Sequence, residues 1–316
     1  MNAEAPFAAG FLVGPTACGK TAVAQWLAER HGYEILSADS MLVYRGMDIG
    51  TAKPSVGERA RVAYHGLDLT TPDLPFSVWE YSRHAHGVLA EASAQGRKVI
   101  VAGGTGLYVK CLTHGLRAAP APDPATRERW ERVEREQGIG ALQEALKARS
   151  PEVYESLRDK ANVRRLLRAL EVAGDGAKGL PATWAEAAPS APLAGIRRTA
   201  DDLKSRVESR VARMYAAGFI DEVEGILRQY PVLSETARQA IGYAEVMDCL
   251  AGRCSPAEAR QRTVIRTRQL AKRQLTWFRH QAEVRWIDVP PGMDTAAIAE
   301  RVMEHWDACG LTRIRS

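Results

Sequence analysis

A glycine-rich loop near the start of the chain constrains its fold more than any other feature. Residues Gly14 to Thr21 read Gly-Pro-Thr-Ala-Cys-Gly-Lys-Thr and match the pattern G-x-x-x-x-G-K-T. In such a loop the backbone N–H groups surround an anion at the positive end of the following helix. The lysine adds a charge on the phosphates, and the last hydroxyl can bind Mg²⁺. The predicted phosphate-binding residues are Gly14, Thr16, Ala17, Cys18, Gly19, Lys20 and Thr21, with Thr21 as the metal ligand.

The sequence around the loop predicts strands alternating with helices. A short apolar run, residues 11–13, leads into the loop, and a helical pattern follows it. Two more apolar runs, residues 34–38 and 98–102, read as buried strands that lead to Asp39 and Thr105. This order predicts an α/β protein with a doubly wound parallel sheet like that of the P-loop nucleoside-triphosphatases. Ligands bind such sheets at the carboxyl ends of the strands, so we expect the loop, Asp39 and Thr105 to lie close together.

The composition changes in the middle of the chain. Residues 118–124 form a proline-rich linker, residues 126–173 are charged and helical in pattern, and residues 174–192 are rich in Gly, Pro and Ala. We therefore predict a small helical domain inserted into the α/β core. The predicted boundaries are residues 120–193 for the insertion and residues 1–119 plus 194–316 for the core.

The overall composition indicates a folded protein of a reducing compartment. Apolar residues make up 46% of the chain, and no segment has the roughly 20 consecutive apolar residues that span a bilayer. The five cysteines form no C-x-x-C pair, which argues against a disulfide framework. We expect a cytoplasmic protein that is neither exported nor embedded in a membrane, and we expect a monomer.

Positive charge is concentrated near the C-terminus. Residues 260–285 contain eight lysines and arginines but one acid, although the net charge of the chain is only +5. Ser-Pro-Ala-Glu at residues 255–258 predicts the start of a long helix that runs to about Arg279. Arginines interspersed with Trp277 and Phe278 suit an RNA partner, because guanidinium and ring planes can stack on unpaired bases. The alternative is a solvated helix face with its aromatic side chains packed on the core.

Asp39 and Thr105, at predicted strand ends, are candidate catalytic groups. Asp39 could be a general base or a partner of Mg²⁺, and a cap for the next turn is the alternative. Thr105 follows Gly103 and Gly104, which permit close approach of a substrate, and capping is again the alternative. In nucleoside-triphosphatases an aspartate usually ends a strand of this kind and helps to hold Mg²⁺. Its absence argues against ordinary ATP hydrolysis, and any diphosphate ester would fit the loop.

Two groups of arginines have helical spacing. Arg206, Arg210 and Arg213 lie at i, i+4 and i+7, so they share one helix face, where like charges repel one another. An anion between them would remove this repulsion, and solvation of the side chains is the alternative. The second group lies on a predicted helix of the insertion and consists of Arg164, Arg165 and Arg168. These three could contact phosphate groups or remain exposed.

Six stretches from Gly14 to Arg279 resemble, in order, the tRNA dimethylallyltransferases, also called isopentenyltransferases. They are Gly14–Thr21, Ser37–Pro54, Gly103–Tyr108, Arg168–Val172, Gln239–Tyr243 and Thr267–Arg279. The stretch at residues 37–54 is the most specific. The resemblance is to the bacterial form, because the chain lacks the zinc-finger extension of some eukaryotic relatives. The sequence departs from the family pattern at residues 159–168, where a His-Pro-Asn-Asp-like stretch is usual.

The resemblance implies transfer of a dimethylallyl group from its diphosphate to N6 of adenosine 37, on the 3′ side of the tRNA anticodon, with release of pyrophosphate. It implies Asp39 as the general base, Thr105 near the amine, and Arg210 as a stabiliser of the leaving charge. Arg206 and Arg127 would also contact the diphosphate, with Mg²⁺. The insertion and the basic helix would hold the anticodon stem-loop. The implied tRNA contacts are Ser40, Met41, Leu42, Arg164, Arg165, Arg168, Gln239, Gly242, Tyr243, Lys272, Arg273, Trp277 and Arg279.

Two other functions fit part of the pattern. A P-loop kinase of a small metabolite would use ATP, but it would give the basic helix no role and would lack its strand-end aspartate. An RNA-binding protein with the loop as a nucleotide switch would leave Asp39 and Thr105 unexplained. Prenyl transfer to tRNA uses all of these features.

Overall fold

Two units make up the chain. The computed structural model describes residues 7–116, 124–157, 159–173 and 191–315. One unit contains residues 1–115 and 186–316, and the other contains residues 116–185. Most of the predicted linker, and of the segment predicted to close the insertion, lies outside the described residues. The predicted domain boundaries at 119/120 and 193/194 therefore stay a prediction.

The first unit is built around one sheet. Its strands are β1 (Ala8–Val13), β2 (Tyr33–Ser37), β3 (Tyr64–His65), β4 (Lys98–Gly103), β5 (Leu193–Arg198), β6 (Val284–Val289) and β7 (Thr312–Arg313). Its helices are α1 (Lys20–His31), α2 (Val56–Arg61), α3 (Val78–Ala94), α4 (Gly106–His114), α9 (Ala200–Ala216), α10 (Phe219–Gln229), α11 (Glu235–Arg238), α12 (Tyr243–Leu250), α13 (Pro256–Gln281) and α14 (Thr295–Cys309).

The strand order brings the predicted site residues to one edge of the sheet. The order is β3-β2-β4-β1-β5-β6 with every neighbouring pair parallel, and β7 pairs antiparallel with the start of β1. Val13 of β1 lies beside Gly103 of β4, and Ser37 of β2 lies beside Ala102. The glycine-rich loop, Thr105 and Asp39 therefore all leave the sheet at the same end. The predicted α/β fold with a doubly wound parallel sheet is confirmed.

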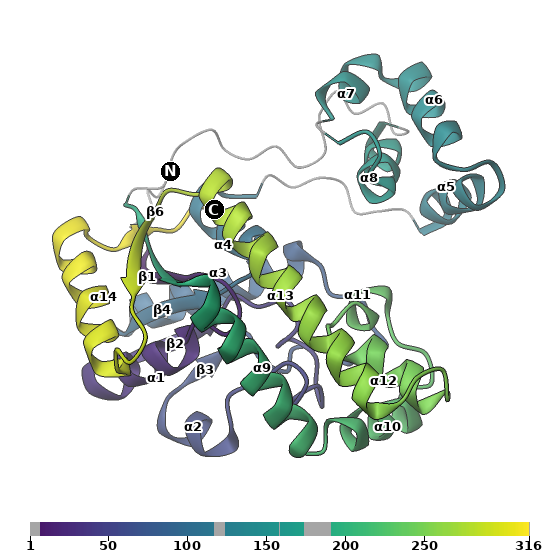
Figure 1. The fold of residues 1–316 in the computed structure, drawn as a ribbon. Coiled ribbons are helices and arrows are strands. Elements are labelled where there is room, and N and C mark those ends of the chain that lie inside the picture. The colour runs from purple at the N-terminus through teal and green to yellow at the C-terminus, as the bar shows by residue number, and fades with distance from the viewer. Residues whose placement is uncertain (1–6, 117–123, 158, 174–190, 316) are drawn as a thin grey trace. The chain divides into compact units, whose positions relative to one another are not determined.

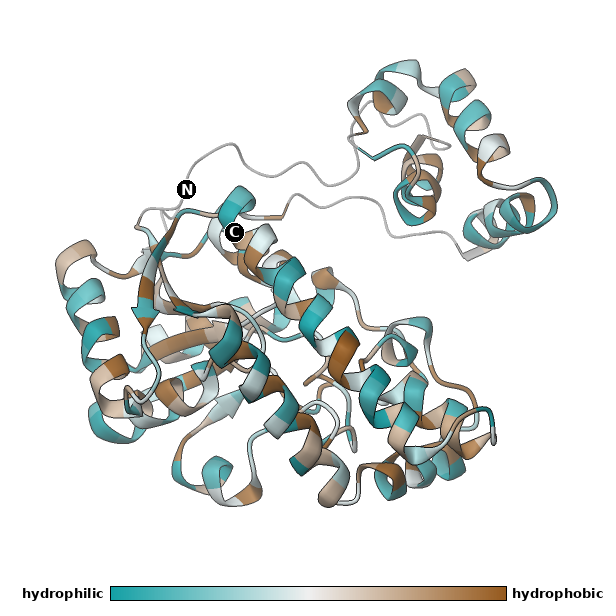
Figure 2. Cartoon of the chain, viewed as in Figure 1, coloured by the Kyte–Doolittle hydropathy of each residue, from teal (hydrophilic) through white to brown (hydrophobic). Residues whose placement is uncertain are grey.

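Helices cover both faces of this sheet. Figure 1 shows α1 and α14 together on one face, with α3 and α4 on the other. The face under α1 and α14 contains a core that includes Leu12, Leu27, Ile100, Ile196 and Trp306, all at most 5% exposed. Burial of each large apolar side chain stabilises the fold by about 1.5–3 kcal/mol. Figure 2 shows hydrophobic residues concentrated on the central strands.

The long helix α13 begins at the predicted residue. Ser255 accepts a hydrogen bond from Glu258 N, Glu258 bonds back to Ser255, and Pro256 occupies the first turn. The helix runs to Gln281, two residues beyond the predicted end. Its buried face, which includes Phe278, packs against α9, α12 and α4. The helix predicted from the spacing of Arg206, Arg210 and Arg213 is also confirmed as α9, with Leu203, Val207, Val211 and Met214 buried.

The second unit is helical, as predicted. It consists of α5 (Pro124–Gln137), α6 (Ile139–Arg149), α7 (Pro151–Ser156) and α8 (Val163–Ala173). Trp130, Leu142, Leu146, Leu166 and Leu170 form its separate apolar core. A unit with its own core can hold its shape independently of the sheet.

Candidate active site

One large pocket opens at the carboxyl end of the sheet in the first unit. Its volume is about 890 Å³, and its walls include the glycine-rich loop, Asp39, Arg206 and Arg210. Thr21 and Leu42 line the same pocket. It lies where β1 and β4 end side by side and their chains continue in opposite directions across the sheet, which is where ligands bind in such folds. The structure thus brings seven of the predicted diphosphate residues into one cavity with the predicted base Asp39, namely Thr16, Ala17, Gly19, Lys20, Thr21, Arg206 and Arg210.

Two arginines from the far half of the sequence fix the backbone of the loop. Arg206 Nε donates to the carbonyl oxygen of Ala17 at 2.9 Å, and Arg198 Nε donates to that of Cys18 at 2.7 Å. Ala17 has a φ of 64°, a left-handed conformation that costs about 1–3 kcal/mol in a residue other than glycine. The two hydrogen bonds help to hold this strained turn. Lys20 Nζ donates to the carbonyl oxygen of Pro15 at 2.7 Å and so lies inside the loop.

Arg210 joins the loop to the segment that follows Asp39. Its Nη1 donates to Thr16 Oγ1 at 3.2 Å, and its Nη2 donates to the carbonyl oxygen of Thr51 at 3.1 Å. Burial lowers the pKa of Arg210, an effect that Asp39 opposes and Arg213 reinforces. Loss of hydration and the adjacent Arg198 likewise lower the pKa of Arg206. Both guanidinium groups therefore lie where a bound anion would offset an unfavourable environment.

Asp39 and Thr105 are held together by the ends of β2 and β4. Thr105 Oγ1 accepts a hydrogen bond from Ser40 N at 3.0 Å, and Thr105 N donates to the carbonyl oxygen of Ala38. Thr105 is the N-cap residue of α4, but its hydroxyl bonds to Ser40 rather than to that helix. Asp39 Oδ1 accepts from Met41 N at 3.0 Å, which is the turn-capping contact. Asp39 also lines the pocket, so the same carboxylate shapes the turn and faces the site.

Gln274 is a site residue that the sequence analysis did not identify. Its Oε1 accepts from Thr16 N at 2.7 Å, and its Nε2 donates to the carbonyl oxygen of Gly104 at 3.0 Å. This side chain of α13 therefore links the loop to the end of β4. Arg198 was missed as well. Gln274 lies within one of the stretches that carry the family resemblance, and that membership was the available signal.

Gly103 sets the spacing between β2 and β4 beneath Asp39. A Cβ atom at Gly103 would lie 2.1 Å from the carbonyl oxygen of Ala38, in backbone that cannot move without displacing Asp39. We expect Gly103→Ala to lower the free energy of unfolding by about 1–3 kcal/mol, measured by chemical denaturation. Gly87→Ala is the control, because this exposed helical position has open space and gains helix propensity. Equal unfolding midpoints for Gly103→Ala and the parent chain would contradict this account of the strand spacing.

The basic helix presents some of its predicted tRNA contacts to solvent. Lys272, Arg273 and Arg279 are exposed on α13. Trp277 is half-buried, and its ring covers Gly106, where a Cβ would come within 2.2 Å of it. Phe278 is fully buried in the core. Each interpretation of the basic helix therefore holds in part. Its cations are exposed, and its aromatic side chains pack against the core.

The predicted tRNA contacts near α12 are likewise partly exposed and partly buried. Gln239 is exposed, whereas Gly242 and Tyr243 are buried, and the Tyr243 hydroxyl donates to Glu222 Oε1 at 2.7 Å. The Tyr243 side chain therefore packs inside this unit and is not exposed for the predicted contact with tRNA. Ser40, Met41 and Leu42 are half-buried beside Asp39.

The helical unit contains the remaining predicted residues. Arg127 Nε bonds to Glu131, and its Nη1 bonds to the buried carboxylate of Glu171 at 3.1 Å. Arg168 bonds to the other oxygen of Glu171 at 3.0 Å. Arg164 and Arg165 are exposed on α8, the helix that also contains Arg168. The proposed roles of these arginines toward diphosphate and tRNA stay predictions.

Comparison with known proteins decides the family. The model of the IPP transferase family matches residues 42–281, and a second model, isopentenyl transferase, matches residues 8–65. The chain belongs to the IPP transferase family. A tRNA dimethylallyltransferase of Geobacter sulfurreducens is 42% identical over 287 residues, which cover 89% of this chain and 92% of the relative. A tRNA dimethylallyltransferase 2 of Geotalea daltonii is 38% identical and covers 97% of this chain and 95% of its own.

Solved structures of the family have the same fold. The full-length tRNA isopentenylpyrophosphate transferase of Bacillus halodurans superposes with a TM-score of 0.69 at 34% identity, covering 94% of this chain and 95% of its own. A eukaryotic dimethylallyltransferase acting on tRNA has a TM-score of 0.73 at 19% identity, covering 95% of this chain and 75% of its own. Membership of this transferase family argues against the small-metabolite kinase. Among the described residues, no helix has the length and apolarity to cross a bilayer.

Proposed function

We propose that the chain transfers a dimethylallyl group from dimethylallyl diphosphate to N6 of adenosine 37 of tRNA. The new bond joins the allylic carbon to N6, the carbon–oxygen bond to the diphosphate breaks, and N6 loses one proton. The observation that carries the proposal is the shared cavity. One pocket is lined by the glycine-rich loop, Arg206, Arg210 and Asp39, so the leaving group and the nucleophile can meet there.

The diphosphate end of the pocket is suited to stabilise the leaving group. Negative charge grows on pyrophosphate as the carbon–oxygen bond breaks, and fixed positive groups aimed at that charge lower the barrier. We assign this role to Lys20, to the loop N–H groups and to Arg210, with Arg206 beside them. The lowered pKa values of the two arginines support this assignment, because a bound anion would offset both their loss of hydration and the repulsion from the neighbouring Arg198 and Arg213.

Mg²⁺ is the proposed cofactor of this end of the pocket. Mg²⁺ keeps several of its waters and takes only one or two protein ligands beside substrate phosphates. Thr21 offers one hydroxyl to the pocket, and Ser37, whose buried hydroxyl has no hydrogen-bond partner among the described residues, lines it too. No group of three or more His, Cys, Asp or Glu side chains that could hold a metal occurs in the described parts of the chain. This donor set fits a diphosphate-bound Mg²⁺, which would neutralise part of the leaving charge.

Asp39 is the proposed general base. The exocyclic amine of adenine is a poor nucleophile, and it must lose a proton as the carbon–nitrogen bond forms. A carboxylate beside the amine can accept that proton. Asp39 reaches the pocket from the end of β2, and Thr105, locked to Ser40, keeps the β2 and β4 ends together. Adenosine 37 must leave the stack of the anticodon loop to reach this position.

The exposed cations of α13 are the proposed tRNA-binding surface of the first unit. Phosphate contacts make RNA affinity fall steeply with salt, by about 0.7–0.9 in the logarithmic slope for each phosphate neutralised. We expect Arg273→Gln combined with Arg279→Gln to weaken tRNA binding and to flatten this slope. Filter binding at several salt concentrations measures both effects. Arg30→Gln combined with Arg301→Gln, at exposed positions on α1 and α14, is the charge-matched control. An unchanged slope in the Arg273→Gln and Arg279→Gln double variant would assign these two arginines to solvated surface.

Mass analysis of tRNA tests the activity itself. After incubation with dimethylallyl diphosphate and Mg²⁺, one adenosine should gain a five-carbon unit and one pyrophosphate should be released for each unit transferred. Digestion to nucleosides then shows whether the modified position is adenosine 37. Turnover of ATP without change in the tRNA would replace the proposal with a phosphoryl transferase, and tRNA binding without any covalent change would favour a nucleotide-switched RNA-binding protein.

A further inference from the structure

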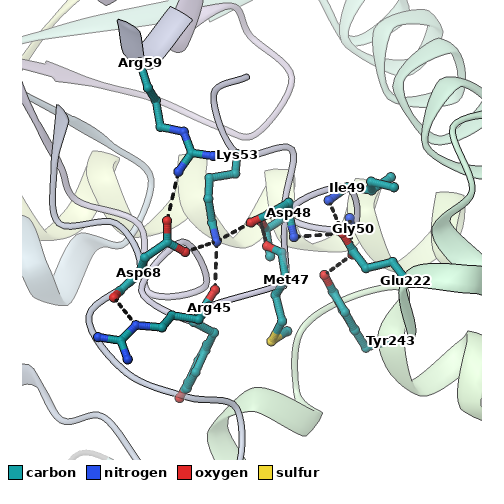
Figure 3. A network of polar contacts seen from close by, with 12 residues as sticks. Arg45, Met47, Asp48, Ile49, Gly50, Lys53, Arg59, Asp68, Glu222 and Tyr243 are labelled. Carbon is teal, nitrogen blue, oxygen red and sulfur yellow. Dashed lines mark hydrogen bonds and ion pairs between the residues drawn. The ribbon is translucent and has the colours of Figure 1, made fainter. Parts of the chain in front are cut away.

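A single carboxylate on α10 captures three consecutive backbone N–H groups of the segment that follows Asp39. Glu222 Oε2 accepts from Asp48 N at 2.9 Å and from Ile49 N at 2.6 Å, and Glu222 Oε1 accepts from Gly50 N at 3.1 Å. Figure 3 shows Glu222 facing this turn from the neighbouring helix. Hydrogen bonds to an ionised acceptor are about twice as strong as neutral ones, so this contact fixes the backbone of residues 48–50.

A buried tyrosine of α12 donates a hydrogen bond to the same Glu222 carboxylate. The Tyr243 hydroxyl donates to Glu222 Oε1 at 2.7 Å, and the Tyr243 side chain is 0% exposed. Burial and the adjacent Glu222 carboxylate raise the pKa of Tyr243, so its hydroxyl remains a donor. Gly50 lies tightly against this support, since a Cβ there would come within 2.2 Å of the Phe219 ring and 2.5 Å of the Tyr243 ring. Because Gly50 has no side chain, residues 48–50 pack directly against the Phe219 and Tyr243 rings, and this close packing restricts the turn to one conformation.

A buried lysine fixes the same turn from its other side. Lys53 Nζ donates to the carbonyl oxygen of Tyr44 at 2.8 Å, to Asp48 Oδ1 at 2.6 Å and to Asp68 Oδ1 at 2.7 Å. The Lys53 side chain is 0% exposed, and Arg59 completes the group through Asp68 (Figure 3). A buried ammonium with three acceptors leaves little freedom to the residues that bind it. Glu222 and Lys53 thus hold residues 48–53 between them.

The turn ends in the carbonyl group that orients Arg210. Thr51 directly follows the residues bound by Glu222, and its carbonyl oxygen accepts from Arg210 Nη2 at 3.1 Å. The other nitrogen, Nη1, donates to Thr16 in the glycine-rich loop at 3.2 Å. We propose that Glu222 is a positioning residue for prenyl transfer, which fixes residues 48–51 so that the Thr51 carbonyl directs the Arg210 guanidinium toward the leaving diphosphate. This inference rests on the proposed function.

Glutamine at position 222 changes the contact with the smallest change in shape. One carboxylate oxygen becomes an N–H₂ group, which faces a backbone N–H or the Tyr243 hydroxyl as a second donor. We expect Glu222→Gln to lower kcat by about tenfold, as for loss of part of a charge-stabilising contact, with little change in KM for tRNA. Glu224→Gln is the matched control, because Glu224 lies two residues away on α10, on another face of the helix, and pairs at the surface with Arg228 at 2.8 Å.

A double-mutant cycle with Arg210→Lys separates positioning from general stability. If Glu222 acts through Arg210, the double variant should have the kcat of Arg210→Lys alone, because the group that Glu222 orients is already lost. Two independent effects would instead multiply. Kinetics are measured with tRNA and dimethylallyl diphosphate, and thermal denaturation confirms that each variant is folded. Tyr243→Phe, which keeps the ring and loses the hydroxyl, should lower kcat in the same direction by a smaller factor and serves if Glu222→Gln does not fold.

The outcomes distinguish this inference from the function on which it rests. A parent chain that transfers no prenyl group to tRNA removes the proposed function. A parent chain that is active, with Glu222→Gln equal to it in kcat or multiplying fully with Arg210→Lys, overturns the role of Glu222 alone.

Discussion

Replacement of Asp39 by asparagine is expected to lower kcat for prenyl transfer by about 10²–10⁴-fold, the usual contribution of a general base. The amide keeps the size of the side chain and can still accept from Met41 N, so the turn at residues 39–41 should survive. It cannot take the proton that N6 loses. Single-turnover kinetics with saturating tRNA and dimethylallyl diphosphate measure the chemical step directly.

Affinity for tRNA separates catalysis from recognition in this variant. We expect the dissociation constant of the Asp39→Asn complex to stay close to that of the parent chain. Asp73→Asn is the control, because Asp73 is an exposed carboxylate on another loop. If the asparagine variant lost tRNA binding but turned over normally once bound, Asp39 would be a recognition residue and another group would have to be the base.

Replacement of Lys20 by methionine is expected to lower kcat/KM for dimethylallyl diphosphate by about 10²–10³-fold, as for removal of one donor to a developing charge. Methionine keeps the unbranched stem of lysine and removes the ammonium that lies inside the loop. The loss should appear with the diphosphate substrate and leave tRNA binding unchanged. Steady-state kinetics with varied dimethylallyl diphosphate measure it.

Lys204→Met on α9 is the matched control for this substitution, because Lys204 is an exposed lysine with the same change in charge and shape. An equal loss in both variants would mean that the net charge of the chain matters and the loop ammonium does not. Full activity of Lys20→Met would remove Lys20 from the diphosphate site.

The sequence predicted those parts of the site whose chemistry is local. A strand, a glycine-rich turn and a helix follow one another at residues 8–31, so the loop is encoded in adjacent residues. The start of α13 is likewise encoded in adjacent residues, because Ser255, Pro256 and Glu258 act within one helical turn. Parallel pairing then aligns the ends of β1, β2 and β4, which places Asp39 and Thr105 at the same end of the sheet as the loop, as general rules for such sheets require.

The parts that escaped prediction depend on contacts between distant residues. Gln274 bonds to a loop residue 258 positions away, Arg198 to one 180 positions away, and Glu222 to Gly50 at a distance of 172 positions. No periodicity or cap signal marks such a residue, because its partner is chosen by the tertiary fold. Tyr243 shows the converse case, since a residue in a family-like stretch that was expected to contact tRNA is instead packed behind Glu222.

The position of β1 has a consequence for how the protein is made. β1 carries the glycine-rich loop and lies between β4, which precedes the helical unit in the chain, and β5, which follows it. During synthesis the ribosome therefore releases the loop with one side of β1 unpaired, and the arginines that fix its carbonyl groups, Arg198 and Arg206, emerge about 100 residues after the end of β4. An open strand edge of this kind is prone to pair with other chains. The nascent N-terminal half should thus depend on rapid completion of the chain, or on chaperones, before it can bind its diphosphate.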